Sequence, residues 1–354
     1  MKHLKTIALF FGGCSTEYEV SLQSAYSVIK SIPTDLYRLV LIGIDKHTGE
    51  WFLYQGDIEE ILTDRWRMQP ECIPAAPSMD RRIHGLSYLS ETGPKTLSLD
   101  AALPILHGKN GEDGTIQGVL NLMNVPVIGC NLLSSALCMD KFLAHQIVAA
   151  EGIKTAKCML LKKDFSVSEV KDQAAKLGFP LFVKPLRSGS SFGITKVQEE
   201  SQLIPAIEQA FLHDSTVMLE EMVAGFEVGC AVLGTEELLI GEVDEIELSE
   251  GFFDYTEKYT LKTSQIHVPA RISFGQAKEI KETACKIYRL LGCSYFARVD
   301  MFLTPEGEIY FNEVNTIPGF TSHSRYPNML KAIGLSFEEI IKRLLDEEFG
   351  NEAV

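Results

Sequence analysis

The sequence predicts an α/β protein whose first part is a parallel sheet and whose C-terminal part is α+β. Residues 6–11 (TIALFF) and 39–44 (LVLIGI) are short apolar runs typical of buried strands, and an amphipathic segment lies between them. A strand, a helix and a second strand in this order are typical of a right-handed parallel unit. Later apolar runs alternate with polar positions, which favours antiparallel pairing in the rest of the chain.

The N-terminal elements follow in a regular order. The turn 12–15 ends the first strand, and Thr16 and Glu19 form the T-x-x-E pattern of a capping box that opens a helix through about Lys30. Residues 45–97 are rich in turn-forming and polar residues, so we interpret them as a decorated insertion whose role the sequence leaves open. The remaining elements expected in this part are a strand at 101–106, a helix at 117–123 and a strand at 125–129.

The second half of the chain is expected to begin with one long helix over 134–152. A Ser/Gly-rich loop, 188–193, then joins two strands, and a long polar loop spans 249–266. The other expected elements are strands near 157–162, 180–184 and 194–197, antiparallel strands at 217–220, 228–233 and 238–243, a helix at 277–291, a hairpin of strands 296–302 and 309–315, and a helix at 335–345.

Composition excludes several classes of protein. The chain has 354 residues, with 33 basic and 48 acidic side chains and a formal charge of −15. This acidic balance excludes general nucleic-acid binding, which needs a basic face for the phosphates. No apolar stretch reaches the ~18–20 residues of a membrane span, and the run 7–11 is too short for a signal peptide. The eight cysteines form no C-x-x-C pair, so we expect reduced core residues in a cytosolic protein.

The most informative polar cluster lies on the predicted C-terminal hairpin. Arg298 and Asp300 share one face of a strand, and Glu313 and Asn315 share one face of its partner. Carboxylates and an amide offer hard oxygen ligands, which suit Mg²⁺ bound together with nucleotide phosphates. The alternative is a solvated polar face of the hairpin. Apolar flanking residues and the segment 316–324 (TIPGFTSHS), with hydroxyls around a Pro-Gly turn, favour a functional site.

A second cluster surrounds the Ser/Gly loop 188–193, which follows the strand that carries Lys184. Backbone N–H groups and hydroxyls of such a loop can wrap phosphate oxygens. The patterns G-x-x-x-x-G-K-[ST] and G-x-G-x-x-G are both absent, which excludes a P-loop and the dinucleotide-binding turn. A plain flexible turn is the alternative. Residues 220–223 (EEMV) and Glu227 are a weaker signal for contacts with a base and a ribose.

Together these segments resemble the ATP-grasp fold and, more closely, the D-alanine–D-alanine ligase family. The likeness covers nearly all of the chain except 45–97. Its carriers are GGCSTEYEVS (12–21), the loop from His107 to Gly118, Asp140-Lys141, Lys184-Pro185 with the Ser/Gly loop, and 312–324. The strings HGKNGEDGT, GFFDYTEKYTLK and NEVNTIPGFTSHSRYPNM are most similar to the VanG type of vancomycin-resistance ligase, which makes D-Ala–D-Ser.

The resemblance implies a division into three domains. They are a Rossmann-like substrate domain (1–129), a central ATP-grasp subdomain (130–219) and a C-terminal ATP-grasp subdomain (220–354) that holds the metal site and a mobile lid, 249–266. It also implies an ADP-forming ligase of peptidoglycan precursor synthesis, located in the cytoplasm and bound to neither nucleic acid nor membrane. Relatives suggest a homodimer with contacts through the N-terminal domain.

By the same resemblance, the nucleotide is ATP. Its phosphates are expected on Lys141, Lys184 and the loop residues Ser188, Ser190 and Ser191. Its adenine and ribose are expected beside Glu220, Glu221, Met222, Val223 and Glu227. The metal ligands match Asp300, Glu313 and Asn315, which would hold two Mg²⁺ ions, with Mn²⁺ as a substitute.

The implied chemistry has two steps. The D-Ala carboxylate attacks the γ-phosphate, and the amine of the second amino acid then attacks the acyl phosphate through a tetrahedral oxyanion. Glu17 is expected to bind the ammonium of the first D-Ala, with His107 beside it. Arg298 and the backbone N–H of Gly319 are expected to stabilise the oxyanion. No residue is identified as the general base for the incoming amine.

The lid is expected to close the site against water. Lys258 would reach a phosphate or the carboxylate of the acceptor. Tyr259 would complete a hydrogen-bonded set with Glu17 and Ser190. Tyr259 also favours an amino acid over D-lactate as the acceptor, because D-lactate-using relatives carry His at the matching position.

The identity of the second substrate depends on few residues. Ser324 is expected to contact the acceptor carboxylate. Arg325 stands where D-Ala–D-Ala ligases usually have Leu, and with Phe252 it favours D-Ser, because a donor placed to bond the hydroxyl selects it. A second D-Ala is the alternative, with Arg325 only forming an ion pair with a neighbouring loop.

Two further alternatives remain open, a ligase with a larger acceptor and an inactive ATP-binding module. The latter predicts loss of one of Lys184, Arg298, Glu313 or Asn315, and all four are present.

Overall fold

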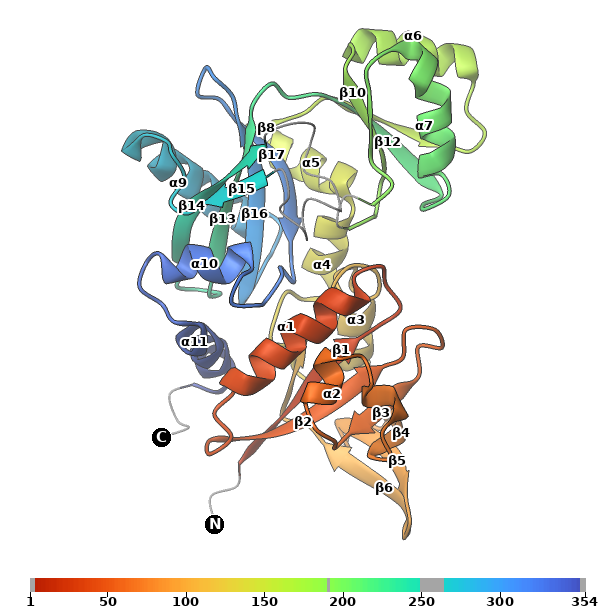
Figure 1. The fold of residues 1–354 in the computed structure, drawn as a ribbon, viewed down its shortest axis with the longest axis vertical. Coiled ribbons are helices and arrows are strands. Elements are labelled where there is room, and N and C mark those ends of the chain that lie inside the picture. Colours follow the sequence, from red (N-terminus) through yellow and green to blue (C-terminus); the bar gives the residue numbers. More distant parts are fainter. Residues whose placement is uncertain (1–3, 190–191, 249–263, 351–354) are drawn as a thin grey trace.

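The computed structural model describes residues 4–189, 192–248 and 264–350, which form three sheets with helices on their faces (Figure 1). The first is a seven-stranded sheet in the order β6-β5-β4-β3-β2-β1-β7. β1 runs parallel to β2 and to β7, and β2 to β6 pair antiparallel in succession. These strands are β1 (Lys5–Gly12), β2 (Tyr37–Ile44), β3 (Trp51–Tyr54), β4 (Cys72–Pro77), β5 (Gly85–Ser90), β6 (Gly93–Ser98) and β7 (Ala101–Pro104).

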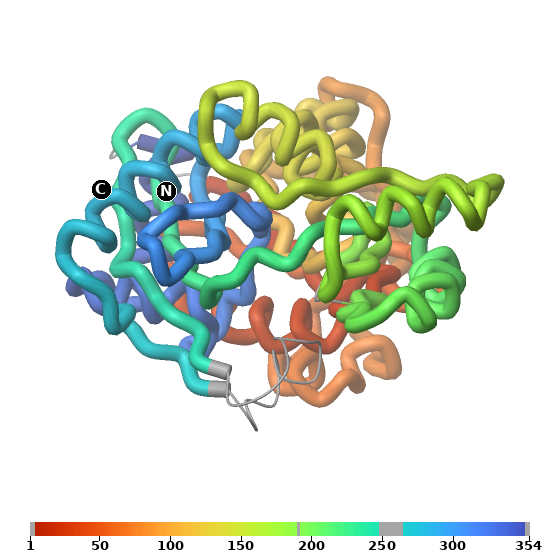
Figure 2. Tube along the Cα trace, turned by 90° about the horizontal axis from the view of Figure 1, so that it is seen from above, coloured from red at the N-terminus to blue at the C-terminus, as the bar shows by residue number. Residues whose placement is uncertain are grey.

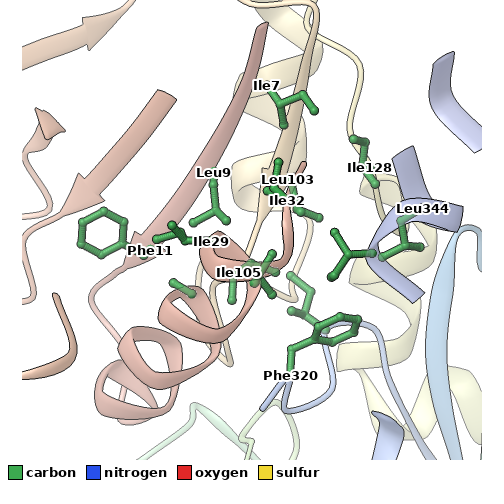
Figure 3. Packing of buried hydrophobic residues seen from close by; sticks show 14 of the residues in the cluster. Ile7, Leu9, Phe11, Ile29, Ile32, Leu103, Ile105, Ile128, Phe320 and Leu344 are labelled. Carbon is green, nitrogen blue, oxygen red and sulfur yellow. The ribbon is translucent and has the colours of Figure 1, made fainter. Parts of the chain in front are cut away.

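β1 is buried on both faces, which explains its continuous apolar run. Leu9 and its neighbours in alternation share a core with helix α1 (Tyr18–Ser31), whereas Phe10 packs in a second core with helix α3 (Thr115–Leu122). The first core also contains Phe320 and Leu344 from the C-terminal part (Figure 3). Apolar packing therefore joins the N-terminal sheet to segments about 300 residues away in the sequence.

The other two sheets are antiparallel except at one edge. A four-stranded sheet has the order β11-β10-β12-β9, and a six-stranded sheet has the order β15-β14-β13-β16-β17-β8, in which β17 and β8 are parallel. The first comprises β9 (Cys158–Lys162), β10 (Leu181–Pro185), β11 (Thr195–Val197) and β12 (Thr216–Glu221). The second comprises β8 (Lys154–Thr155), β13 (Phe226–Leu233), β14 (Leu239–Leu248), β15 (Ser264–His267), β16 (Phe296–Leu303) and β17 (Ile309–Asn315).

Seen from above, the green segments of the four-stranded sheet lie beside the cyan and blue segments of the six-stranded sheet (Figure 2). Helices α6 and α7 cover the smaller sheet, and α9 packs on the larger one (Figure 1). The N-terminal sheet lies below both (Figure 1). The further helices are α2 (Glu59–Leu62), α4 (Leu132–Met139), α5 (Lys141–Ala150), α6 (Val167–Leu177), α7 (Leu203–Ala210), α9 (Phe274–Leu290), α10 (Arg325–Lys331) and α11 (Phe337–Phe349).

The predicted α/β class, the first parallel unit and the hairpin of β16 and β17 are confirmed. The prediction of a capping box formed by Thr16 and Glu19 is wrong. Glu17 is the N-cap of α1 and no side chain caps the helix, because the chain turns into the helix only at Tyr18 and the Glu17 N–H donates to Ser15 Oγ at 2.9 Å instead.

The expected helix over 134–152 is broken in two at Asp140. This residue ends α4 and also caps α5, since its side chain accepts the N–H of Leu143 at 3.1 Å. The expected strand at 125–129 is reduced to a single bridge between Val127 and Ala102. The strand predicted at 217–220 lies in a different sheet from those at 228–233 and 238–243, which alternation cannot distinguish.

Residues 45–97 are more than an insertion, because β3 to β6 extend the N-terminal sheet. Trp66 is fully buried there and packs edge-on against Phe11 of β1. Among the described residues no helix is both long and apolar enough to cross a bilayer. The structure describes all eight cysteines as free thiols. Four of them are buried, and the other four, Cys14, Cys72, Cys158 and Cys285, are only half-buried, so the expectation of core residues holds for half of the set.

Candidate active site

A cavity of about 490 Å³ opens between the four-stranded and six-stranded sheets. We name it the nucleotide cavity. It brings together six of the residues expected to bind ATP, namely Lys184, Glu220, Glu221, Met222, Val223 and Glu227. Phe182 and Phe302 add apolar walls that the sequence reasoning missed. Phe182 stands two positions before Lys184 on β10, so strand alternation could have placed it on the same face.

Lys184 and Glu220 form a buried ion pair in this cavity. Their charged atoms are 2.5 Å apart, and their side chains are only 7% and 5% exposed. The pairing of β10 with β12 produces this contact, because it sets Phe182 opposite Glu220 and Lys184 one pleat further along. The cavity thus combines apolar walls for a planar base with a fixed cation and carboxylates, the usual composition of a nucleotide site.

The hairpin of β16 and β17 presents the predicted metal-binding residues together. Its register sets Asp300 opposite Glu313 and Arg298 opposite Asn315. The Arg298 guanidinium donates two hydrogen bonds to Asp300, of 2.8 and 2.7 Å, and the Asn315 amide donates a third at 2.8 Å. Lys141 lies 3.3 Å from Glu313. Each carboxylate is therefore balanced by a cation.

These residues suit a Mg²⁺ ion that takes only part of its ligands from the protein. The described residues contain no cluster of three or more His, Cys, Asp or Glu side chains arranged for a metal ion. Two carboxylates and the Asn315 amide are too few ligands for a caged ion. They suit an ion that completes its coordination with phosphate oxygens and water, which is the ordinary mode of Mg²⁺ at phosphoryl-transfer sites.

A smaller cleft of about 30 Å³ lies where the three sheets approach one another. We name it the donor cleft. It is lined by the predicted residues Glu17, Lys141, Ser188, Glu313 and Asn315. Lys141 also donates to the Ser188 carbonyl at 2.9 Å, which ties α5 to the Ser/Gly loop. A Cβ at Gly189 would lie 2.4 Å from Glu17 Oε2, so only glycine permits this close approach.

Glu112 also lines the donor cleft, and the sequence reasoning did not select it. Its two oxygens accept the backbone N–H groups of Gly108 and Ile317, at 2.9 and 2.8 Å. Loss of solvent, followed by the nearby charge of Glu17, raises the pKa of this carboxyl to about 8. Its position in a Gly-rich loop directly after β7 was the available signal, because such loops often carry function.

His107 is held by hydrogen bonds within the protein. The imidazole is buried, with Nδ1 at 2.7 Å from the Ile317 carbonyl and Nε2 at 3.0 Å from Ser24 Oγ. Both ring nitrogens are therefore bonded within the protein and neither is presented to a substrate. Burial lowers the pKa of His107, which keeps the ring neutral near pH 7. His107 supports the segment that carries Gly319.

Gly319 and Ser324 lie beside each other. A Cβ at Gly319 would lie 3.0 Å from Ser324 Oγ. The Ser324 hydroxyl accepts the N–H of Thr321 at 3.1 Å and lies 2.8 Å from the Thr321 hydroxyl. The contacts between Thr321 and Ser324 close this turn, and α10 begins directly after it.

Arg325 is buried over the strands of the six-stranded sheet. It binds Asp244 through Nε and Nη2, at 2.7 and 2.8 Å, and Glu227 through Nη1 at 2.6 Å. Asp300 is 3.6 Å from Nη2. Arg325 therefore does form ion pairs, as the alternative expected, but its partners lie on the strands β13, β14 and β16 and not on a loop. Three of the five guanidinium hydrogens are used in these hydrogen bonds.

The remaining predicted residues, Ser190, Ser191, Phe252, Lys258 and Tyr259, lie outside the described part of the chain.

Comparison with known proteins agrees with this geometry. Residues 6–130 match the family model described as D-ala D-ala ligase N-terminus, and residues 147–346 match D-ala D-ala ligase C-terminus. The vancomycin C-type resistance protein VanC1 of Enterococcus gallinarum is 44% identical over 97% of this chain and 98% of its own length. A D-alanine–D-alanine ligase of Caldicellulosiruptor bescii is 38% identical over 96% of this chain and 93% of its own length.

A solved structure is also similar over the whole fold. The VanG D-Ala:D-Ser ligase from Enterococcus faecalis superimposes with a TM-score of 0.91 at 54% identity, covering 98% of this chain and 100% of that one. The chain therefore belongs to the D-alanine–D-alanine ligase family, which includes the vancomycin-resistance ligases, and it has the ATP-grasp fold. It is an ATP-dependent D-amino acid ligase.

Proposed function

We propose that this enzyme joins D-alanine to D-serine through a D-alanyl phosphate, and so supports peptidoglycan precursors that end in D-Ala–D-Ser and glycopeptide resistance. The observation that carries the proposal is the similarity over the whole chain to a D-Ala:D-Ser ligase, at 54% identity. The housekeeping alternative, with D-Ala as both substrates, draws its support from the 38% identical ligase of C. bescii.

Arg325 gives the proposal a physical basis. Asp244 is fully buried and fixes the guanidinium plane with two hydrogen bonds. Two of the five guanidinium hydrogens are not used in the three hydrogen bonds described above. A rigid donor of this kind favours a substrate with a hydroxyl, because an acceptor that lacks the hydroxyl leaves the donor unpaired. Phe252 would form a wall of the same subsite.

The nucleotide roles follow the cavities. Lys184 and Lys141 would bind phosphates, with Ser188, Ser190 and Ser191 of the Ser/Gly loop closing over them. The base and ribose would lie in the nucleotide cavity beside Glu220, Glu221, Met222, Val223 and Glu227. Asp300, Glu313 and Asn315 would hold two Mg²⁺ ions, or Mn²⁺ in their place. Bound there, the metal neutralises charge on the phosphate oxygens during phosphoryl transfer.

The donor roles follow the cleft. Glu17 would bind the ammonium of the first D-Ala, and Arg298 with the Gly319 N–H would stabilise the oxyanion of the second step. Ser324 would bind the carboxylate of the acceptor. Lys258 and Tyr259 would close the site from the predicted lid and exclude water from the acyl phosphate. The predicted range, 249–266, is too long at its end, because residues 264–267 form strand β15 and pair with β14.

Three wider features complete the proposal. The domains are placed at 1–129, 130–219 and 220–354. The enzyme is a homodimer that meets through its N-terminal domain. It works in the cytoplasm, which the eight free thiols support.

The decisive experiment measures products rather than turnover alone. The enzyme is given ATP and Mg²⁺ with D-Ala alone, and then with equal D-Ala and D-Ser, near neutral pH, and the dipeptides are identified by mass. We expect D-Ala–D-Ser as the main product of the mixture. A yield of D-Ala–D-Ala that equals or exceeds it would refute D-Ser as the preferred acceptor and support the housekeeping role.

A further inference from the structure

The segment that carries Gly319 is held from the N-terminal sheet at three backbone atoms. The N–H of Ile317 donates to Glu112 Oε1 at 2.8 Å, and the carbonyl of Ile317 lies 2.7 Å from His107 Nδ1. The N–H of Phe320 donates to Ser24 Oγ at 3.1 Å. Gly319 lies between these points of attachment. Its peptide is therefore oriented by residues of the N-terminal part, namely Ser24 on α1 and His107 and Glu112 in the loop after β7.

The hydrogens in this network have one consistent arrangement. A carbonyl only accepts, so His107 Nδ1 carries the hydrogen that bonds to Ile317. In the neutral ring Nε2 is then the acceptor, and it receives the hydroxyl hydrogen of Ser24. The Ser24 oxygen in turn accepts the N–H of Phe320. A directed chain of hydrogen bonds thus runs from Phe320 through Ser24 and His107 to Ile317.

Glu112 is matched to its two partners. Each carboxyl oxygen accepts one backbone N–H, from Gly108 in the same loop and from Ile317 in the loop after β17. Below the raised pKa of Glu112, the oxygen that carries the proton still has a lone pair for this contact. A glutamine of the same shape has only one acceptor oxygen, and its NH₂ group would face the second N–H. The carboxyl group is therefore required for both bonds, and the bond to Ile317 joins the loop after β7 to the loop after β17.

Apolar packing fixes the same segment from its other side. Ile317 and Phe320 are buried in the core that contains Ile32, Ile105 and Leu344 (Figure 3). Phe320 also stacks on Tyr326 at a ring distance of 5.4 Å. Because the side chains are anchored by this packing, loss of a hydrogen bond from Glu112 or Ser24 alters the peptide orientation and leaves the segment in place.

We propose that Glu112 and Ser24 are positioning residues, which aim the Gly319 amide at the reacting carbonyl by holding Ile317 and Phe320 on either side of it. The inference rests on the proposed function, in which the Gly319 N–H stabilises the oxyanion of the second step. Neither residue touches the nucleotide cavity. Glu112 lines the donor cleft, but its two hydrogen bonds there are to the backbone N–H groups of Gly108 and Ile317. Removal of these contacts should therefore slow peptide-bond formation more than acyl phosphate formation.

The experiment compares Glu112→Gln and Ser24→Ala with matched controls in the full-length enzyme. Glu19→Gln and Ser27→Ala lie on α1 outside the network, where Ser27 only bonds the carbonyl of Gln23. Steady-state kcat and KM are measured for ATP and each amino acid. Oxygen-isotope scrambling in ATP with D-Ala alone reports acyl phosphate formation separately, because that step involves no tetrahedral carbon.

We expect kcat for dipeptide formation to fall about 10- to 100-fold in Glu112→Gln and Ser24→Ala, the cost of a misplacement near 1 Å. Isotope scrambling and the KM for ATP should stay within about threefold of wild type, well below that effect. Both controls should match wild type.

Two results would overturn the inference. One is a lowered thermal midpoint with unchanged kcat, which shows a merely structural role. The other is an equal fall in scrambling and ligation, which places the effect before the second step. Glu112 is only half-buried, so Glu112→Gln decides the question if Ser24→Ala fails to fold. Failure of the proposed function is a separate outcome, since it is seen in the products of the wild-type enzyme, as a yield of D-Ala–D-Ala that equals or exceeds that of D-Ala–D-Ser.

Discussion

The nucleotide cavity and the donor cleft are built in different ways. Lys184 and Glu220, which meet in the cavity, lie on adjacent strands of one sheet. The donor cleft joins the start of α1, the loop after β7, the start of α5, the Ser/Gly loop and the end of β17. Its contact between Glu112 and Ile317 spans 205 residues of sequence. Strand pairing therefore secures the cavity, whereas the cleft depends on how the sheets dock, and substitutions should separate the two.

The largest difference between the two regions is expected from Arg298→Ala, which should impair catalysis and spare nucleotide binding. The guanidinium is buried and bidentate on Asp300, and in the proposed mechanism it stabilises the oxyanion. We expect kcat to fall about 10²- to 10³-fold, as for removal of an oxyanion donor. Binding of ADP, measured by calorimetry, should remain. Arg298→Lys should recover little, because an ammonium cannot reproduce the two-pronged contact. Unchanged turnover would refute the mechanism.

Lys184→Met tests the nucleotide cavity through the stability of its buried ion pair. It leaves Glu220 as an unpaired charge whose side chain is 5% exposed. We expect the free energy of unfolding in denaturant to fall by about 3–5 kcal/mol, together with weaker nucleotide binding.

The double variant Lys184→Met, Glu220→Leu should regain stability without regaining affinity for the nucleotide. The control Lys157→Met breaks an ion pair whose lysine is 79% exposed and should cost less than about 1 kcal/mol. Loss of affinity without loss of stability in the single variant would contradict the buried-pair argument.

Gly189→Ala tests the close contact between the Ser/Gly loop and Glu17 in the donor cleft. The new Cβ would lie 2.4 Å from Glu17 Oε2, so the loop or the carboxylate must shift. Overpacking of this size costs about 1–3 kcal/mol, which should appear mainly as a raised KM for the first D-Ala. Gly275→Ala, whose nearest contact is 4.0 Å away, is the control. An unchanged KM for D-Ala would argue against Glu17 as the ammonium site.

The last effect concerns pH. The pKa of Glu112 is raised from 4.5 to about 8 in the folded protein. Between these values the folded state keeps a proton that the unfolded chain has lost, so the contribution of Glu112 to stability falls as pH rises through this window.

Glu112→Gln should therefore flatten the decline in unfolding free energy between about pH 5 and about pH 8, measured by urea denaturation without ligands. The exposed Glu19→Gln should keep the wild-type slope. Parallel curves for Glu112→Gln and wild type would show that the carboxyl titrates normally.

The parts of the site that sequence reasoning found are those with local signals. Alternation on β16 and β17 placed Asp300 and Glu313 together, and the structure confirms their register. The split of the predicted 134–152 helix at Asp140 was missed. An aspartate inside an apolar helical pattern is usually an exposed helical position, and only the structure shows that this side chain caps α5. Glu112 was missed because its partners are backbone groups, which have no sequence signature.

The sequence by itself determined the α/β class, the buried β1, the C-terminal hairpin and the identity of the charged groups, because period and residue type are local properties. Only the tertiary structure decided which of those groups meet. It placed the His107 ring beside the carbonyl of Ile317, 210 residues away, and it placed Arg325 on Asp244 and Glu227. These contacts arise from the docking of separate sheets through a shared core, and no local pattern encodes that docking.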